Sequence, residues 1–162
     1  MSMMGYLAAV NDIELAQIRF GRRSAGDFFF GEDSEPVEMN KAWHTIHFVL
    51  CSGAWGRDSV FLSLAILGGQ PAGEEEVGYG PVIYLTADLV KEVHASLQKV
   101  TKEAFRKLFS LRELRENQVY PILDPEEDEE DFFSFVWSYM EVVKAFYADA
   151  AREGKNRLLC IA

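Results

Sequence analysis

Hydrophobic residues recur at intervals of three and four positions along much of the chain, which is the spacing of one face of an α-helix. Met39, Trp43, Ile46 and Leu50 follow this spacing and predict a helix over residues 41–51, with Asn40 as its N-cap. A second, longer helix is predicted to begin at Asp124. Its broad apolar face would contain Phe132, Phe133, Val136, Trp137, Met140, Val143, Phe146, Tyr147 and Ala150.

Short, continuous apolar runs predict strands at both ends of the chain and in its middle, over residues 5–10, 81–85 and 157–161. Together with the helices they predict an α+β fold, in which a small mixed sheet that includes both terminal strands packs against a majority of helices. No repeat or linker interrupts the pattern. The whole chain, residues 1–162, is therefore predicted to be a single domain.

Two segments have no regular hydrophobic period. Residues 21–38 are predicted to be an irregular loop, and residues 71–80 an acidic, glycine-rich loop whose charge would repel phosphate. The first segment contains Phe28-Phe29-Phe30, and three adjacent aromatic residues in a polar loop must be buried or be exposed for a purpose. They could anchor the loop to the body of the protein or form a flap over a pocket. We favour the anchor.

Composition and charge restrict the functions that fit. The 162 residues are 49% apolar and 13% aromatic, which indicates a folded protein, and the chain carries a formal net charge of −10. The charge argues against nucleic acid or an anionic membrane surface as a partner and permits a basic protein partner.

Cys51 and Cys160 form no C-x-x-C pair, and the first ten residues lack the pattern of a secretory signal. We therefore expect reduced thiols and a cytoplasmic location. The sequence does not indicate the oligomeric state.

The predicted helix 41–51 concentrates residue types that can carry chemistry: Trp43, His44, His47 and Cys51. Three metal ligands on one helix could not easily surround a zinc ion, and the H-E-x-x-H arrangement is missing, so no metal site is assigned. A catalytic Cys–His pair would need an electropositive setting, of which this region shows little. The interpretation we favour is that His47 lies in the core or in a pocket wall and is satisfied by a backbone carbonyl or a carboxylate.

Aromatic residues elsewhere could complete a pocket around this helix. The candidate pocket residues are Trp43, His44, His47, Tyr79, Tyr84 and Tyr120, although their spacing suits core positions equally well. The sequence shows no Ser-His-Asp order, nucleophile elbow or dinucleotide fingerprint. No catalytic residue and no cofactor is therefore assigned.

A run of six acidic residues is the second candidate site: Glu126, Glu127, Asp128, Glu129, Glu130 and Asp131. Negative charge is favourable at a helix N-terminus, but the effect decays within the first turn, so six carboxylates exceed it. The run is either a solvated surface, which is the usual role of such a run, or a docking patch for a basic protein. Calcium fits poorly, because the spacing of an EF-hand loop is missing.

Four short motifs, taken in order, resemble the YfbM-like family. They are Met4-Gly5-Tyr6, then Lys41-x-Trp43-x-x-Ile46-His47-Phe48-x-Leu50, then Tyr84-Leu85-Thr86, and finally Tyr120-Pro121. The resemblance covers essentially the whole chain and implies a bacterial α+β domain of unknown function. It supplies no catalytic residue to transfer. Many members of that family carry tryptophan or another apolar residue after Tyr120-Pro121, so the resemblance implies that the acidic run is a local feature of this chain.

Two functions from different classes follow from these observations. The leading hypothesis is a non-catalytic binding or interaction protein that masks a basic protein partner, because the chain is acidic and shows no catalytic constellation. The alternative is a small-molecule-binding protein or enzyme with a pocket walled by Trp43 and His47, in which His47 acts as general base or hydrogen-bond donor.

Overall fold

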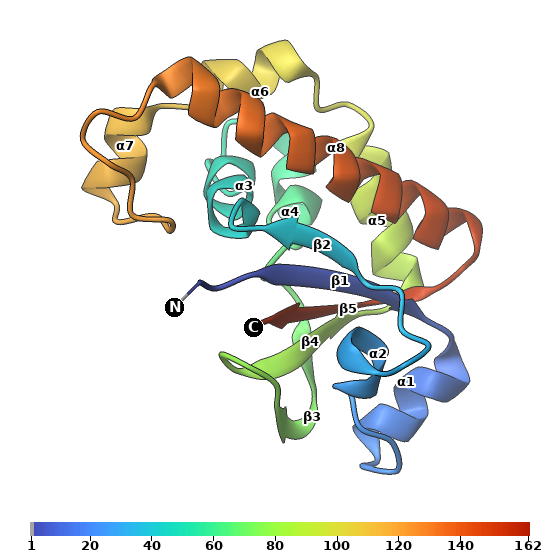
Figure 1. The fold of residues 1–162 in the computed structure, drawn as a ribbon. Coiled ribbons are helices and arrows are strands. Elements are labelled where there is room, and N and C mark those ends of the chain that lie inside the picture. Colours follow the sequence, from blue (N-terminus) through green and yellow to red (C-terminus); the bar gives the residue numbers. More distant parts are fainter. Residues whose placement is uncertain (1) are drawn as a thin grey trace.

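A five-stranded antiparallel sheet with helices on both faces forms the protein in the computed structural model, which describes residues 2–162 (Figure 1). The strand order is β2-β1-β5-β4-β3. The strands are β1 (Gly5–Val10), β2 (Val37–Asn40), β3 (Gln70–Glu76), β4 (Pro81–Leu85) and β5 (Asn156–Ile161). The two terminal strands, β1 and β5, pair along their whole length, from Gly5 opposite Ile161 to Val10 opposite Asn156. The predicted α+β class and the two terminal strands are confirmed, and the strands pair antiparallel throughout rather than in a mixed sheet.

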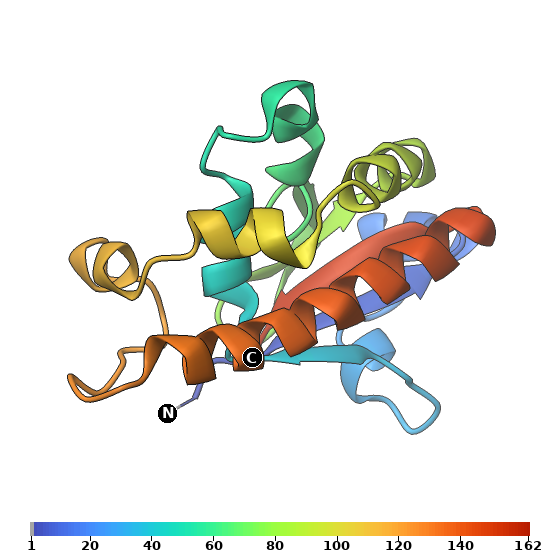
Figure 2. The same ribbon diagram turned by 90° about the horizontal axis from the view of Figure 1, so that it is seen from above.

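Helices cover the two faces of the sheet unequally (Figure 1). On one face lie α3 (Trp43–Leu50), α4 (Ser59–Leu62), α5 (Ala87–Leu97) and α8 (Glu129–Arg152), with a short 3-10 turn, η1 (Gly56–Asp58), before α4. On the other face lie α1 (Asp12–Arg19) and α2 (Asp27–Phe30). Helices α6 (Lys102–Leu108) and α7 (Leu111–Glu116) flank the beginning of α8, which crosses the molecule diagonally when it is seen from above (Figure 2).

The strands divide their side chains between two hydrophobic cores, because successive residues of a strand point to opposite faces. In β5, Leu159 belongs to the large core beneath α3, α5 and α8, whereas Leu158 and Cys160 belong to the small core beneath α1 and α2. In β4, Leu85 and Tyr84 are divided in the same way. Residues on neighbouring positions of one strand therefore face different halves of the molecule.

Helix α3 packs closely on β1 at Gly5. A Cβ atom at this position would lie 2.8 Å from the Cβ of Trp43 and 2.9 Å from the Cε of Met39, which is closer than real Cβ atoms approach. Glycine is therefore the residue that lets the helix and the strand meet here.

Two predicted helix caps are wrong. Asn40 ends β2 in the left-handed region, with φ of 51°, and its side chain accepts the Lys41 N–H at 2.8 Å, so that Ala42 occupies the N-cap position of α3. Asparagine tolerates this conformation and here forms the turn between strand and helix. Helix α8 begins at Glu129 rather than at Asp124. Asp128 is its N-cap, because residues 124–127 form a separate turn.

The two predicted loops contain regular structure. Most of residues 71–80 belong to the edge strand β3, so the prediction of a loop there is wrong. An edge strand can keep Glu74, Glu75 and Glu76 in solvent while it buries Ala72, which is 1% exposed. The segment 21–38 contains α2 and the first residues of β2. Within α2, Phe29 is buried in the small core and anchors the segment as predicted, whereas Phe28 is half-buried and Phe30 is 55% exposed.

No helix among residues 2–162 combines the length and the apolar character that crossing a bilayer requires.

Candidate functional site

The structure brings three of the candidate pocket residues, Trp43, His44 and Tyr120, into one stacked cluster. The ring of Trp43 stacks on His44 at a centroid distance of 5.1 Å and on Tyr120 at 5.9 Å. The indole N–H of Trp43 donates to the carbonyl of Met3 at 3.0 Å, and the Tyr120 hydroxyl accepts the Met3 N–H at 2.9 Å. The cluster therefore ties the N-terminal segment, α3 and the segment around Tyr120 together.

His44 completes this cluster as a hydrogen-bond acceptor. Its Nδ1 accepts the backbone N–H of Tyr120 at 2.9 Å, which requires that Nδ1 carry no proton. Burial lowers the pKa of His44 below its ordinary value, and this favours the neutral ring. The geometry assigns His44 a role in holding the segment that follows α7.

His47 contacts a thiol rather than the carbonyl or carboxylate that the sequence led us to expect. The Sγ atom of Cys51 lies 3.6 Å from both Nδ1 and Nε2 of the His47 ring. A sulfur atom that lay along the lone pair of one ring nitrogen would be much farther from the other ring nitrogen. Because the two distances are equal, the thiol is aligned with neither nitrogen. Burial raises the pKa of the Cys51 thiol, and burial together with His44 lowers the pKa of His47. This arrangement does not generate a thiolate.

Tyr79 and Tyr84 lie away from this cluster. Tyr84 belongs to the small core on the other face of the sheet, where the guanidinium of Arg19 lies 5.1 Å from its ring. Tyr79 is 49% exposed in the turn between β3 and β4, and its backbone N–H donates to Ile161. Five surface hollows of about 390 to 820 Å³ within residues 2–162 are lined by residues other than Trp43, His44, His47 and Tyr120.

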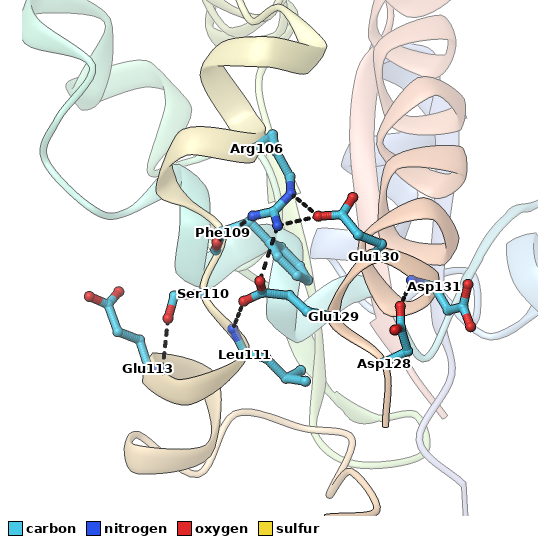
Figure 3. Close-up of polar contacts among 9 residues, drawn as sticks. All are labelled: Arg106, Phe109, Ser110, Leu111, Glu113, Asp128, Glu129, Glu130 and Asp131. Atoms are coloured by element: carbon cyan, nitrogen blue, oxygen red, sulfur yellow. Dashed lines mark hydrogen bonds and ion pairs between the residues drawn. The ribbon is translucent and has the colours of Figure 1, made fainter. Parts of the chain in front are cut away.

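Half of the acidic run makes contacts within the protein (Figure 3). Arg106 of α6 forms ion pairs with Glu129, at 3.1 Å, and with Glu130. Glu129 also accepts the N–H of Leu111 at 2.9 Å, and Asp128 caps α8 by accepting the N–H of Asp131. The hydrogen bond from Leu111, with a further contribution from Arg106, lowers the pKa of Glu129. The run therefore joins α6, α7 and α8. Its pairing with Arg106 could not be predicted from the sequence, because no local pattern connects the two segments.

The other half of the run has no basic partner among the residues that the structure describes. Glu126, Glu127 and Asp131 carry carboxylates that form no ion pair within residues 2–162. Glu126 and Asp131 are exposed and Glu127 is half-buried. These three side chains are therefore the carboxylates of the run that no basic residue of the described chain neutralises.

A larger acidic feature lies at the opposite end of α8. A hollow of about 820 Å³ opens between the segment 27–35 and the C-terminal end of α8, over β1. Its apolar lining includes Ala8, Phe28, Val37 and Phe146. Seven carboxylates line it against two basic residues, Arg23 and Lys155; we call this hollow the acidic groove. The carboxylates belong to Glu14, Asp27, Glu32, Asp33, Glu35, Asp149 and Glu153.

The seven carboxylates of the acidic groove fall into a paired and an unpaired group. Glu14 of α1 is paired, because it lies 3.7 Å from Arg23. Those on α8 and just after it are paired, since Asp149 lies 2.9 Å from Arg152, and Glu153 lies 3.8 Å from both Arg152 and Lys155. The other group comes from the segment 27–35. Its four side chains are exposed and form no ion pair within residues 2–162; they are Asp27, Glu32, Asp33 and Glu35.

Sequence reasoning missed this groove, although part of the signal was visible. The segment 21–38 combines acidic residues with Phe28, and that combination could have suggested a charged surface over an apolar floor. The opposite wall comes from the last turns of α8, more than a hundred residues later, and no local pattern links the two. Within residues 2–162, no group of three or more His, Cys, Asp or Glu side chains is arranged to hold a metal ion.

Comparison with known proteins places the chain in a family without assigning an activity. A crystal structure described as a protein of unknown function, YfbM from Escherichia coli, has the same fold with a TM-score of 0.74; the two chains are 22% identical, and the match covers 98% of this chain and 99% of that one. No curated protein sequence matches the chain. A family model described as "Domain of unknown function (DUF1877)" matches residues 1–160. The resemblance to YfbM-like proteins is thereby confirmed, and the chain belongs to the DUF1877 family.

Proposed function

We propose that this protein is a non-catalytic binding protein that accommodates a basic segment of a protein partner in its acidic groove. The observation that carries the proposal is the combination of an apolar floor with four exposed, unpaired carboxylates on the segment 27–35. Proteins bind partners through a desolvated apolar centre within a polar rim, and this groove has both parts. The partner would supply the positive charge that the groove lacks.

Electrostatics favour a basic partner over a neutral one. The chain has a formal net charge of −10, and clefts lined by one sign of charge concentrate the field and speed the approach of an oppositely charged molecule. Rim charges of this kind contribute mainly to the association rate and to its dependence on salt. The groove therefore supports the masking of a basic surface, as the overall charge led us to expect.

The groove is separate from the remaining exposed part of the acidic run. Glu129 and Asp149 lie at opposite ends of α8, a separation of about 30 Å along the helix axis. At that distance, charges in solvent are largely screened from each other at physiological ionic strength. The two surfaces can consequently be tested one at a time.

The thiol of Cys51 gives no support to the alternative of a cysteine-dependent enzyme. Cys51 is not aligned with either nitrogen of His47, and burial raises the pKa of its thiol, so these two residues do not form a Cys–His nucleophile. The cytoplasm, which we propose as the location, is a compartment in which the free thiols of Cys51 and Cys160 would stay reduced.

The test measures binding of fluorescein-labelled peptides in which arginine or lysine alternates with apolar residues, by fluorescence anisotropy over a range of salt concentrations. In the groove variant, Asp27→Asn, Glu32→Gln, Asp33→Asn and Glu35→Gln are combined. The control, which removes three negative charges instead of four, combines Glu126→Gln, Glu127→Gln and Asp131→Asn at the far end of α8.

We expect the native protein to bind basic peptides, and the groove variant to bind them about tenfold or more weakly with a smaller salt dependence. The control variant should bind like the native protein. The proposal is wrong if no basic peptide binds to the native protein, or if the groove variant binds unchanged. If only the control variant loses affinity, the binding surface is the acidic run and not the groove.

A further inference from the structure

One basic side chain of the protein already occupies part of the acidic groove. The guanidinium of Arg23 lies over the ring of Phe28, 4.1 Å from its centroid, and its Nη1 lies 3.7 Å from a carboxylate oxygen of Glu14. All three residues line the groove. Arg23 thus makes the two contacts that arginine typically makes in a recognition site, a stack on an aromatic face and a pairing with a carboxylate.

The two partners of Arg23 are held in place independently of it. Glu14 belongs to the capping box of α1, in which its other oxygen accepts the N–H of Asn11 at 3.0 Å. Phe28 lies in α2, and this helix is fixed by the burial of Phe29. The turn before α2 is fixed as well, because Glu75 of β3 accepts the N–H of Ala25 at 2.9 Å. The aromatic face and the carboxylate are therefore preorganised.

Arg23 itself is held weakly. Its side chain is 43% exposed, and the 3.7 Å distance to Glu14 is longer than a hydrogen bond. This partly exposed ion pair contributes little, because water and salt screen the attraction between its charges. The position can therefore exchange one guanidinium for another.

We propose that Phe28 and Glu14 form an arginine subsite in the acidic groove, which Arg23 fills in the free protein and from which an arginine of the basic partner displaces it. This inference rests on the proposed function and adds the identity of one recognised side chain. The subsite favours arginine over lysine, because a planar guanidinium can stack on the Phe28 ring while it pairs with Glu14. The ammonium of lysine is a hydrated point charge and cannot make both contacts in this way.

Arg23 then acts as a competitor built into the chain. A ligand that must displace an internal group binds with an affinity reduced by the fraction of protein in which the site is open. Because the internal contact is weak, we expect its removal in Arg23→Gln to raise the affinity for an arginine peptide by about two- to fivefold.

The experiment compares two basic peptides that differ only in carrying arginine or lysine at every charged position, with anisotropy as the readout. Arg22→Gln is the matched control, since it removes the same charge from the neighbouring residue, whose side chain does not line the groove. Phe28→Leu removes the aromatic face and Phe28→Tyr keeps it. Circular dichroism confirms that each variant is folded.

We expect the native protein to prefer the arginine peptide, and Arg23→Gln to raise arginine binding more than lysine binding. Arg22→Gln should change both slightly and equally, Phe28→Leu should abolish the preference, and Phe28→Tyr should retain it. The inference is overturned if Arg23→Gln and Arg22→Gln have the same effect, if the two peptides bind equally well, or if the preference survives in Phe28→Leu. If the two peptides bind equally well, the proposed function still stands. If neither peptide binds, both the proposed function and the arginine subsite are overturned.

Discussion

The carboxylate of Glu129 accepts a hydrogen bond from the backbone N–H of Leu111, at 2.9 Å, and thereby joins the first turn of α8 to the first turn of α7 (Figure 3). The free N–H groups at a helix N-terminus normally need a partner from nearby in the chain. Here α7 receives one from a residue eighteen positions later, in addition to the Ser110 cap, whose side chain accepts the N–H of Glu113. The same carboxylate pairs with Arg106, so a single side chain connects three helices.

Replacing Glu129 should therefore destabilise the protein more than replacing other residues of the acidic run. Glu129→Ala removes the acceptor for Leu111 and one partner of Arg106, and we expect it to lower the free energy of unfolding by about 1–2 kcal/mol. Urea denaturation followed by circular dichroism measures this difference. Glu126→Ala is the control, because Glu126 is exposed and forms no ion pair within residues 2–162, and it should stay within about 0.5 kcal/mol of the native protein. Equal losses in the two variants would contradict the role assigned to Glu129.

The buried guanidinium of Arg157 should be among the most sensitive positions of the fold. Arg157 is fully buried in β5 and donates to the carbonyls of Leu64, at 3.1 Å, and Gly68, at 2.9 Å, and to the hydroxyl of Tyr147, at 3.2 Å. A methionine of similar length would relieve the burial of a charge but would leave these acceptors without donors. Each unsatisfied acceptor costs about 1–3 kcal/mol, so the loss outweighs the relief.

We expect Arg157→Met to lower the free energy of unfolding by about 2 kcal/mol or more, measured by urea denaturation. Arg152→Met is the control, because Arg152 makes only exposed ion pairs at the end of α8 and should change the stability by less than about 1 kcal/mol. A stable Arg157→Met variant would show that water or a shift of the chain satisfies the carbonyls of residues 64–68.

The sequence predicted those parts of the fold that are governed by local hydrophobic spacing. The period of three and four located α3 and α8, and the short apolar runs located β1, β4 and β5, because in each case one face of the element is buried. It failed for β3, where three consecutive glutamates on an exposed edge hide the single buried side chain of Ala72. The pattern of an edge strand resembles that of a loop, since little of it is buried.

The candidate sites were harder to predict, because they are formed by segments that lie far apart in the sequence. Stacking of Trp43 with His44 follows from adjacent positions, but the contact with Tyr120 and the role of Arg106 depend on segments brought together by the tertiary fold. The acidic groove depends on this still more, because its walls come from opposite ends of the chain. Spacing along the sequence carries no information about such pairs of segments.

Histidine protonation should make the protein less stable at mildly acidic pH. Burial lowers the pKa of His44 in the folded state below its ordinary value of 6.5, so the unfolded chain binds a proton more readily than the folded one. The free energy of unfolding should thus fall as the pH drops below about 6.5 and continue to fall until the folded-state pKa is passed. His47, whose pKa burial and His44 also lower, contributes with the same sign.

Urea denaturation at several pH values between about pH 7.5 and pH 5 tests this dependence. In His44→Asn the side-chain oxygen can still accept the N–H of Tyr120, whereas the group no longer titrates, so the slope of stability against pH should become smaller. His47→Asn should reduce the slope separately, and the double variant should reduce it further. An unchanged slope in the double variant would assign the pH dependence to other groups.

The thiol of Cys51 should react slowly, in spite of its exposure and its neighbour His47. Its Sγ lies at the same distance, 3.6 Å, from both ring nitrogens and is aligned with neither, and burial raises the pKa of the thiol above its ordinary value of 9.0. At about pH 8 the thiolate fraction should consequently be smaller than that of free cysteine, and alkylation by iodoacetamide should be slower.

Mass spectrometry can follow Cys51 selectively, because Cys160 is 1% exposed and burial raises its pKa to about 11. Cys51→Ser supplies the background from Cys160. His47→Ala should not slow the reaction, since His47 does not deprotonate the thiol; a fast reaction below pH 7 that this substitution abolishes would instead identify a working Cys–His pair and favour an enzyme over a binding protein.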